Sequence, residues 1–183
     1  RTELPSNNLH GTIPPSIDNT VLFGFDVSGN KITGTIPDSI GLVTTLWGTN
    51  FVEPVEGYGF EGTIPSSMGM LTRLQLLGVS NNRLTGSIPA ELGALTHIRV
   101  VSFAGNSLTG PIDEGLCPML SNAGHCFLVG NDFQCPIPEC ASSCGIAQCS
   151  NSTTTMGNSA GSDSLSSILS LACFVTMIAA NVV

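Results

Sequence analysis

The sequence predicts an elongated solenoid of stacked coils, each of which contains a short β-strand. Three observations support this fold: a recurring segment, apolar residues spaced two apart within it, and a cysteine cluster after its last copy. From Gly11 to Cys135 the copies are 23, 28, 24, 24 and 25 residues apart. A nearly fixed period of this length is typical of repeat proteins, whose units pack only against their neighbours. The copies are Leu4–Pro14, Val27–Pro37, Val79–Pro89 and Phe103–Asp113, with weaker ones at Val55–Pro65 and Leu128–Pro138.

Each clear copy belongs to a longer unit with the pattern LxxLxxLxLxxNxLxGxIPxxLG. In the fourth unit Leu77 and Val79 stand two residues apart, which is the spacing of a short strand with one buried face. Leu71 and Leu74 fill the space behind that strand. Asn82 follows it, and its amide can bond backbone groups that the turn leaves unpaired in the neighbouring coil. Stacking therefore predicts a ladder of asparagines. The ladder consists of Asn7, Asn30, Asn82, Asn106 and Asn131.

The segments ITGTIP at Ile32–Pro37 and LTGSIP at Leu84–Pro89 resemble the plant-specific subclass of leucine-rich repeats. The resemblance covers roughly residues 4–138. It implies a leucine-rich repeat solenoid of the α/β solenoid class, curved and right-handed. Short parallel β-strands would form a sheet on its inner face, with a second short strand near GxIP and irregular or short 3₁₀ turns outside. We assign residues 1–115 to the repeats.

The third repeat departs from the pattern. Pro54 stands where the asparagine is expected, and about four additional residues follow before the pattern resumes at Gly62. The departure includes Trp47, the only tryptophan, which we expect to face outward from its strand, and Glu53 and Tyr58 in the insertion. Loops on a rigid scaffold commonly carry binding residues. The alternative is a decayed repeat whose aromatic side chains pack back onto the solenoid.

The inner face is the expected ligand-binding surface, because small and polar outward residues on a concave sheet suit a peptide, a protein loop or a glycan. The alternative is that these small residues have no binding role. Trp47 is the strongest candidate, since a large exposed aromatic side chain lowers solubility unless it is covered or used. The candidate ligand-binding residues are Trp47, Asn50, Glu53, Tyr58, Leu76, Ser80 and Ser102.

Six of the seven cysteines fall between residues 117 and 149. An open stack exposes its last apolar layer to water, so it needs a terminal cap. We expect residues 116–149 to form the last repeat and a cap closed by disulfides, which implies a secretory route. A zinc cluster is the competing interpretation, but the spacing contains no CxxC knuckle, so we expect no metal. The cysteines are Cys117, Cys126, Cys135, Cys140, Cys144 and Cys149, and six cysteines allow 15 pairings.

The composition changes after the cysteine cluster. Residues 150–164 are rich in Ser, Thr, Gly and Asn, which predicts a flexible stalk, and Asn151 begins the only N-glycosylation sequon. Residues 165–183 are apolar and carry no charge. Together with the small residues before it, this tail resembles a glycosylphosphatidylinositol attachment signal, with Asn158, then Ser159, as the attachment residue. A single transmembrane span is the alternative, although it would be short and lacks a basic residue beyond it.

Charge and motif content argue against other classes. The formal net charge is −8 and the five basic residues are dispersed, which disfavours a nucleic-acid partner. His10, His97 and His125 lie in three different repeats, and we find no convergent catalytic set or cofactor motif. We therefore expect no catalytic residue and no cofactor.

These observations predict a non-enzymatic, receptor-like glycoprotein on the extracellular face of the plasma membrane, held there by a lipid anchor. Its partner would be an extracellular protein, peptide or glycan, bound in a receptor or co-receptor role. The alternatives are a structural wall or surface-coat protein and an inhibitor of an extracellular wall-degrading hydrolase. The chain begins at Arg1 rather than Met, so we expect further sequence before it.

Overall fold

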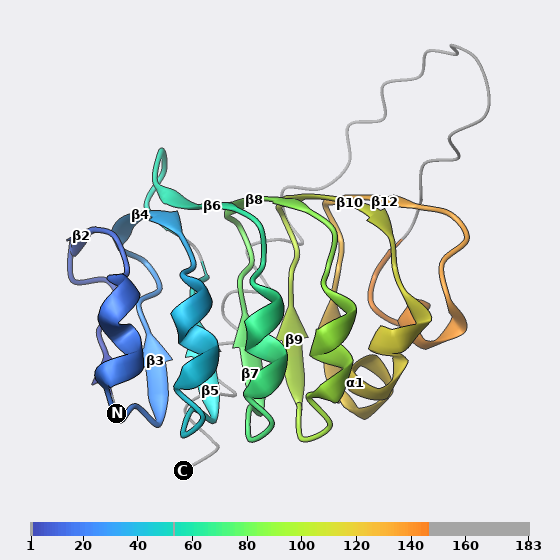
Figure 1. The fold of residues 1–183 in the computed structure, drawn as a ribbon. Helices are drawn as coiled ribbons and strands as arrows, with labels where there is room; N and C mark the ends of the chain where they lie inside the picture. The colour runs from blue at the N-terminus through green and yellow to red at the C-terminus, as the bar shows by residue number, and fades with distance from the viewer. Residues whose placement is uncertain (1, 53, 147–183) are drawn as a thin grey trace. The chain divides into compact units, whose positions relative to one another are not determined.

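Figure 1 shows the computed structural model of the chain, which describes residues 2–52 and 54–146. These residues form a row of coils that lie side by side in chain order, from blue to orange (Figure 1). A regular coil contributes one short strand to a first sheet, one short strand to a second sheet and one 3₁₀ helix. The predicted solenoid of stacked coils is confirmed.

The first sheet is parallel, and paired residues occupy the same position in successive coils. Gly48–Asn50 pairs with Gly24–Asp26 on one side and with Leu76–Gly78 on the other. The strands in spatial order are β1 (Thr2–Glu3), β3 (Gly24–Asp26), β5 (Gly48–Asn50), β7 (Leu76–Gly78), β9 (Val100–Ser102) and β11 (His125–Phe127).

The second sheet is also parallel, but its pairing is offset by two residues from coil to coil. The motif glycine of one coil lies opposite the apolar residue of the next, as Gly62 lies opposite Leu84. Gly62 has φ +79°, a conformation that residues with a side chain rarely adopt. Cys135 holds the glycine position in the last coil and does not adopt a positive φ. The strands are β2 (His10–Gly11), β4 (Lys31–Thr35), β6 (Gly59–Gly62), β8 (Arg83–Gly86), β10 (Ser107–Pro111) and β12 (Asp132–Gln134).

A 3₁₀ helix follows the second strand of each coil. Pro89 precedes η4 with φ −63° and ψ 132°, an extended conformation that proline favours. Neighbouring helices pack closely: a Cβ on Gly93 would lie 1.9 Å from the carbonyl oxygen of Gly115, so this position requires glycine. The helices are η1 (Pro15–Asn19), η2 (Asp38–Leu42), η3 (Ser66–Met70), η4 (Ala90–Ala94), η5 (Glu114–Leu116) and η6 (Glu139–Ala141).

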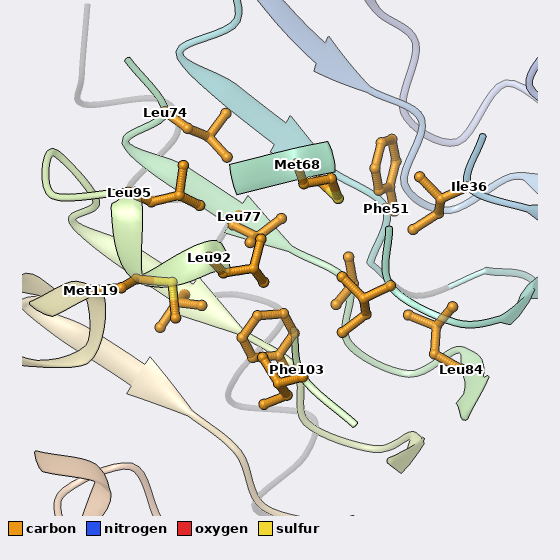
Figure 2. Close-up of a cluster of buried hydrophobic side chains, with 14 of the residues drawn as sticks. Ile36, Phe51, Met68, Leu74, Leu77, Leu84, Leu92, Leu95, Phe103 and Met119 are labelled. Carbon is orange, nitrogen blue, oxygen red and sulfur yellow. The ribbon is translucent and has the colours of Figure 1, made fainter. Parts of the chain in front are cut away.

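A continuous apolar core runs through the coils. Figure 2 shows part of it, with Leu74, Leu77 and Leu92 of the fourth coil among the buried side chains. Thr49 lies opposite Leu77 in the sheet and therefore occupies the same core position in the third coil. Its side chain is fully buried, and its Oγ1 has no hydrogen-bond partner.

Asn82 shows how the asparagine ladder joins coils. Its Nδ2 donates to the carbonyl oxygens of Val79 (2.9 Å) and Ser80 (3.1 Å) in its own coil and to that of Phe51 (2.7 Å) in the preceding coil. Its Oδ1 accepts a hydrogen bond of 2.8 Å from the backbone N–H of Phe60. One side chain thus satisfies backbone groups on both sides of a turn.

Asn30, Asn106 and Asn131 bond to the preceding coil in the same way. Asn7 differs, because no described coil precedes its own. Its side chain is exposed, and its Nδ2 donates only within the same segment, to the carbonyl oxygen of Pro5. Within the described residues the Asn7 side chain therefore bonds to no second coil, and its place in the ladder stays a prediction.

The third coil replaces the ladder asparagine with a local turn. The backbone N–H of Val55, next to Pro54, donates to the carbonyl oxygen of Asn30 at 3.0 Å. The N–H of Tyr58 then donates to the carbonyl oxygen of Val55 at 2.9 Å, which closes the turn before β6. The neighbouring coils keep their register across this replacement.

Disulfides close the last coil. Cys117 begins the short helix α1 (Cys117–Asn122) and bonds to Cys140, while Cys126 in β11 bonds to Cys144. Cys135 is also disulfide-bonded. The structure thus selects a pairing that the sequence left open.

Several predicted features lie outside the described residues. Among the residues that are described, no helix has the length and apolar character needed to cross a bilayer. The features outside are Glu53, Cys149, the sequon at Asn151, the attachment candidates Asn158 and Ser159, the 150–164 stalk and the 165–183 tail.

Candidate ligand-binding surface

Residues of the first sheet alternate between the core and the opposite face, which we call the inner face. In β7, Leu77 belongs to the core, so Leu76 and Gly78 lie on the inner face. The sheet register extends this alternation to the other coils. The inner face of the third to fifth coils consists of Gly48, Asn50, Val52, Leu76, Gly78, Ser80, Val100, Ser102 and Ala104.

Four candidate residues on the inner face are buried, although the sequence analysis expected them to face solvent. Asn50 is 3% exposed, Leu76 5%, Ser80 3% and Ser102 0%. Strands in a sheet lie about 4.8 Å apart, so short side chains on adjacent strands cover one another. The hydroxyl groups of Ser80 and Ser102 bond to each other, and Leu76 lies opposite Val100. These positions offer little side-chain surface to a ligand.

Asn50 belongs to a polar cluster on the inner face. Asp26 Oδ1 accepts hydrogen bonds from the backbone N–H (2.9 Å) and hydroxyl (2.7 Å) of Ser28. Asp26 Oδ2 accepts one from Asn50 Nδ2 at 3.2 Å. Asn50 Oδ1 is buried and has no partner. The cluster satisfies the carboxylate and leaves one amide acceptor unused.

Trp47 lies immediately before β5 rather than within it. Its N–H donates to the carbonyl oxygen of Phe23, and its own carbonyl oxygen accepts from the N–H of Gln75, both at 2.7 Å. The carbonyl oxygen of Gln75 accepts from the N–H of Arg99 at 2.7 Å. These four residues form a column across four coils, one position before each strand. Trp47 was expected within the strand, but the strand begins at Gly48, and the Trp47 side chain is half-buried.

A pocket of about 290 Å³, which we call the edge pocket, opens beside Trp47. Two of its polar side chains are held by the preceding coil. Thr45 Oγ1 donates to the carbonyl oxygen of Leu22 at 2.5 Å. His97 Nδ1 donates to the carbonyl oxygen of Thr72 at 2.9 Å, since a carbonyl oxygen only accepts. The lining residues are Phe23, Thr45, Trp47, Arg73, Gln75 and His97.

Of the residues that line this pocket, only Trp47 was predicted from the sequence as a ligand-binding residue. The signal was available, because the same repeat positions that hold Thr45 and Trp47 in the third coil hold Arg73 and Gln75 in the fourth. Once the coils are stacked in register, side chains 24 to 28 residues apart become neighbours.

Tyr58 is not part of the edge pocket. Trp47 adjoins the start of β5, whereas Tyr58 follows the end of β5 and adjoins β6 at the other edge of the first sheet (Figure 1). The Tyr58 ring is 39% exposed, and the Nζ atom of Lys31 lies 5.9 Å from its centroid. The structure therefore separates two aromatic residues that the sequence analysis grouped together.

A second pocket, of about 540 Å³, lies beside the Cys117–Cys140 disulfide. Glu114 and Glu139 contribute carboxylates to its lining, together with Ser121 and Pro138. In the described part of the chain no three His, Cys, Asp or Glu side chains are grouped so as to hold a metal ion. The edge pocket is the better ligand site, because it combines aromatic surface with several hydrogen-bond donors.

Comparison with known proteins identifies the family. A family model described as leucine-rich repeat matches residues 22–42 and 73–95. A solved structure of the complex of BIR3 and SERK2 from Arabidopsis thaliana is 33% identical with a TM-score of 0.62, over 78% of this chain and 72% of that chain. The chain belongs to the leucine-rich repeat family.

Larger leucine-rich repeat structures also match this protein. The ectodomain of the Arabidopsis receptor kinase HAESA, solved with an extended IDA peptide hormone, is 34% identical with a TM-score of 0.69. The match covers 78% of this chain and 24% of that one. The plant peptide hormone receptor RGFR1, solved with RGF2, is 29% identical with a TM-score of 0.69, over 78% and 22% of the two chains. This leucine-rich repeat chain thus spans about a quarter of these structures. A search of curated proteins found no match.

Proposed function

We propose that this leucine-rich repeat protein is an extracellular, non-enzymatic module that binds a peptide or protein segment in a receptor or co-receptor role. The edge pocket is the observation that carries the proposal, because it places aromatic rings and hydrogen-bond donors together on a rigid sheet edge. The complexes of HAESA and RGFR1 with peptide hormones support a peptide as the class of ligand.

The construction of the pocket favours binding. Phe23, Trp47 and Gln75 are joined through backbone hydrogen bonds of 2.7 Å, so their Cα positions are held before a ligand arrives. Side chains that are already positioned lose less conformational entropy on binding, which raises affinity for a given contact area.

The test is selection of a random peptide library on the immobilised protein. We expect selected peptides to bind Phe23→Ala and Trp47→Ala variants at least tenfold more weakly, since buried aromatic contacts are common binding hot spots. Phe23 is 51% exposed, so its replacement should leave the melting temperature nearly unchanged. Met70→Ala, which removes a side chain with 52% exposure from η3, is the matched control and should bind normally.

Equal binding to the wild type, Phe23→Ala and Trp47→Ala would contradict the pocket as the site. Selection of no peptide at all would favour the structural wall or surface-coat role. Binding and inhibition of a wall-degrading hydrolase would favour the inhibitor role.

We also propose that the protein carries a lipid anchor at the outer face of the plasma membrane, attached at Asn158 or Ser159. The apolar 165–183 tail supports the anchor, and the disulfides of the cap support an oxidising compartment. Phospholipase treatment of intact cells should release the protein. A mature C-terminal peptide that contains Phe174 would contradict the anchor and favour a membrane span.

The remaining assignments of the sequence analysis are part of the same proposal. They are membership in the plant-type subclass marked by LTGxIP, a boundary between repeats and cap near residue 115, and a glycan on Asn151. Mass spectrometry of the secreted protein, before and after removal of N-glycans, tests the glycan.

A further inference from the structure

We propose that the edge pocket binds an acidic side chain of an extended peptide, next to an apolar side chain held against Phe23 and Trp47. This inference depends on the proposed peptide-binding function and specifies the chemistry of its ligand. It follows from the donor content of the pocket, the charge around it and its size.

Hydrogen-bond donors outnumber acceptors in the lining. Arg73 carries five N–H donors and the Gln75 amide two. The side-chain acceptors are the hydroxyl oxygen of Thr45, whose proton is already donated to Leu22, and the amide oxygen of Gln75. His97 Nδ1 donates its proton to the carbonyl oxygen of Thr72, so Nε2 is one more acceptor when the ring is neutral. A carboxylate only accepts, so it complements this lining.

The local charge is positive although the formal net charge of the chain is −8. Arg73 lines the pocket, and Arg99 continues the column that contains Trp47 and Gln75. Within the described part of the chain neither guanidinium group forms an ion pair. The residues that line the pocket come from two positions of the repeat, one and three residues before each strand of the first sheet. Neither position holds Asp or Glu in any of the four coils, so this edge attracts anions. These positions are Val21, Phe23, Thr45, Trp47, Arg73, Gln75, His97 and Arg99.

The size and apolar surface of the pocket indicate how much of a peptide it holds and what lies next to the acidic side chain. A volume of about 290 Å³ is at the lower end for ligand pockets, so it holds a part of a peptide rather than a whole ligand. Phe23 is half exposed and adjoins Trp47, and together they offer an apolar wall beside Arg73. An acidic residue flanked by an apolar one matches these two parts.

The lining fits a neutral sugar less well, because sugar hydroxyl groups donate as well as accept and the donors of this pocket outnumber its acceptors. An acidic sugar shares the carboxylate with an acidic peptide. The peptide is favoured because related receptors were solved with peptide hormones, and the experiment separates the two.

The experiment uses a random peptide library with amidated C-termini, so that every carboxylate comes from a side chain. We expect peptides selected on the wild-type protein to be enriched in Asp and Glu next to an apolar residue. Arg73→Gln should bind them about tenfold or more weakly, which corresponds to the loss of a charge-assisted hydrogen bond. Replacing the peptide carboxylate by an amide should weaken binding to the wild type but not weaken binding to Arg73→Gln further.

Arg83→Gln is the matched control, because Arg83 is an exposed arginine of the same coil that lies in β8 of the second sheet. It should bind the selected peptides as the wild type does. The inference would be overturned if the selected peptides need Trp47 for binding but are not enriched in Asp and Glu, or if Arg73→Gln binds them as tightly as the wild type does. The proposed function would then still stand. Selection of no peptide would overturn both. Arg73-dependent binding of a uronic acid oligosaccharide in place of peptides would overturn the peptide assignment.

Discussion

The third and fourth coils form the same strands in the same register, yet they achieve this with different residues. The fourth coil has Leu77 in the core and Asn82 in the ladder, whereas the third has Thr49 and Pro54 at those positions. Regular coils on both sides hold the third coil in place, since each coil packs against its neighbours. A repeat with regular neighbours on both sides can therefore keep its strands and register without the residues of the pattern.

The largest expected effect is at the core position that distinguishes the two coils. Leu77→Ala should lower the free energy of unfolding by about 3 kcal/mol, because it leaves a cavity in a fully buried site. Thr49→Ala removes fewer apolar atoms and should cost about 1 kcal/mol. Urea denaturation measures both. Equal losses would show that the third coil contributes as much to the core as the fourth.

The ladder position should give the next largest effect. Asn82→Ala leaves the backbone N–H of Phe60 and the carbonyl oxygen of Phe51 without their side-chain partner, at a cost of about 2 kcal/mol. Asn7→Ala is the control, because the exposed Asn7 side chain bonds only to Pro5, and it should cost less than about 0.5 kcal/mol. Thermal melting of both variants checks the difference, and similar losses would contradict the role of the ladder in joining coils.

Thr49→Val should have a smaller effect of opposite sign. It keeps the shape of the side chain and removes a buried hydroxyl group that has no partner, so stability should rise by about 1 kcal/mol. The matched change Leu77→Thr should lower stability. A lower melting temperature for Thr49→Val would mean that the hydroxyl group forms a bond that the structure does not show.

The smallest effect is expected at the turn that replaces the ladder in the third coil. Tyr58→Ala removes a partly exposed contact with Lys31 and should cost about 0.5 kcal/mol or less. Peptide binding at the edge pocket should be unchanged, because Tyr58 lies at the other edge of the sheet. A binding loss equal to that of Trp47→Ala would mean that the two edges act as one site.

The sequence by itself determined the stack. The spacing of Leu77 and Val79, the asparagine after them and the proline before most of the 3₁₀ helices are local features that repeat, so one coil predicts the others. The broken third repeat was predictable for the same reason, since Pro54 interrupts a known pattern. The disulfide pairing was not predictable, because the four described partners are joined across 18 and 23 residues of chain.

Only the tertiary structure decided where a ligand could bind. The sequence placed Trp47 and Tyr58 in one irregular segment, but β5 lies between them, so the two residues lie at opposite edges of the sheet. Stacking instead brings Trp47 next to Phe23 and Gln75, which are 24 and 28 residues away in the chain. It also buries the small inner-face residues Asn50 and Ser102, which the sequence could only assign to a face. Side-chain exposure and neighbours in adjacent coils depend on packing between repeats, and the pattern within one repeat does not contain that information.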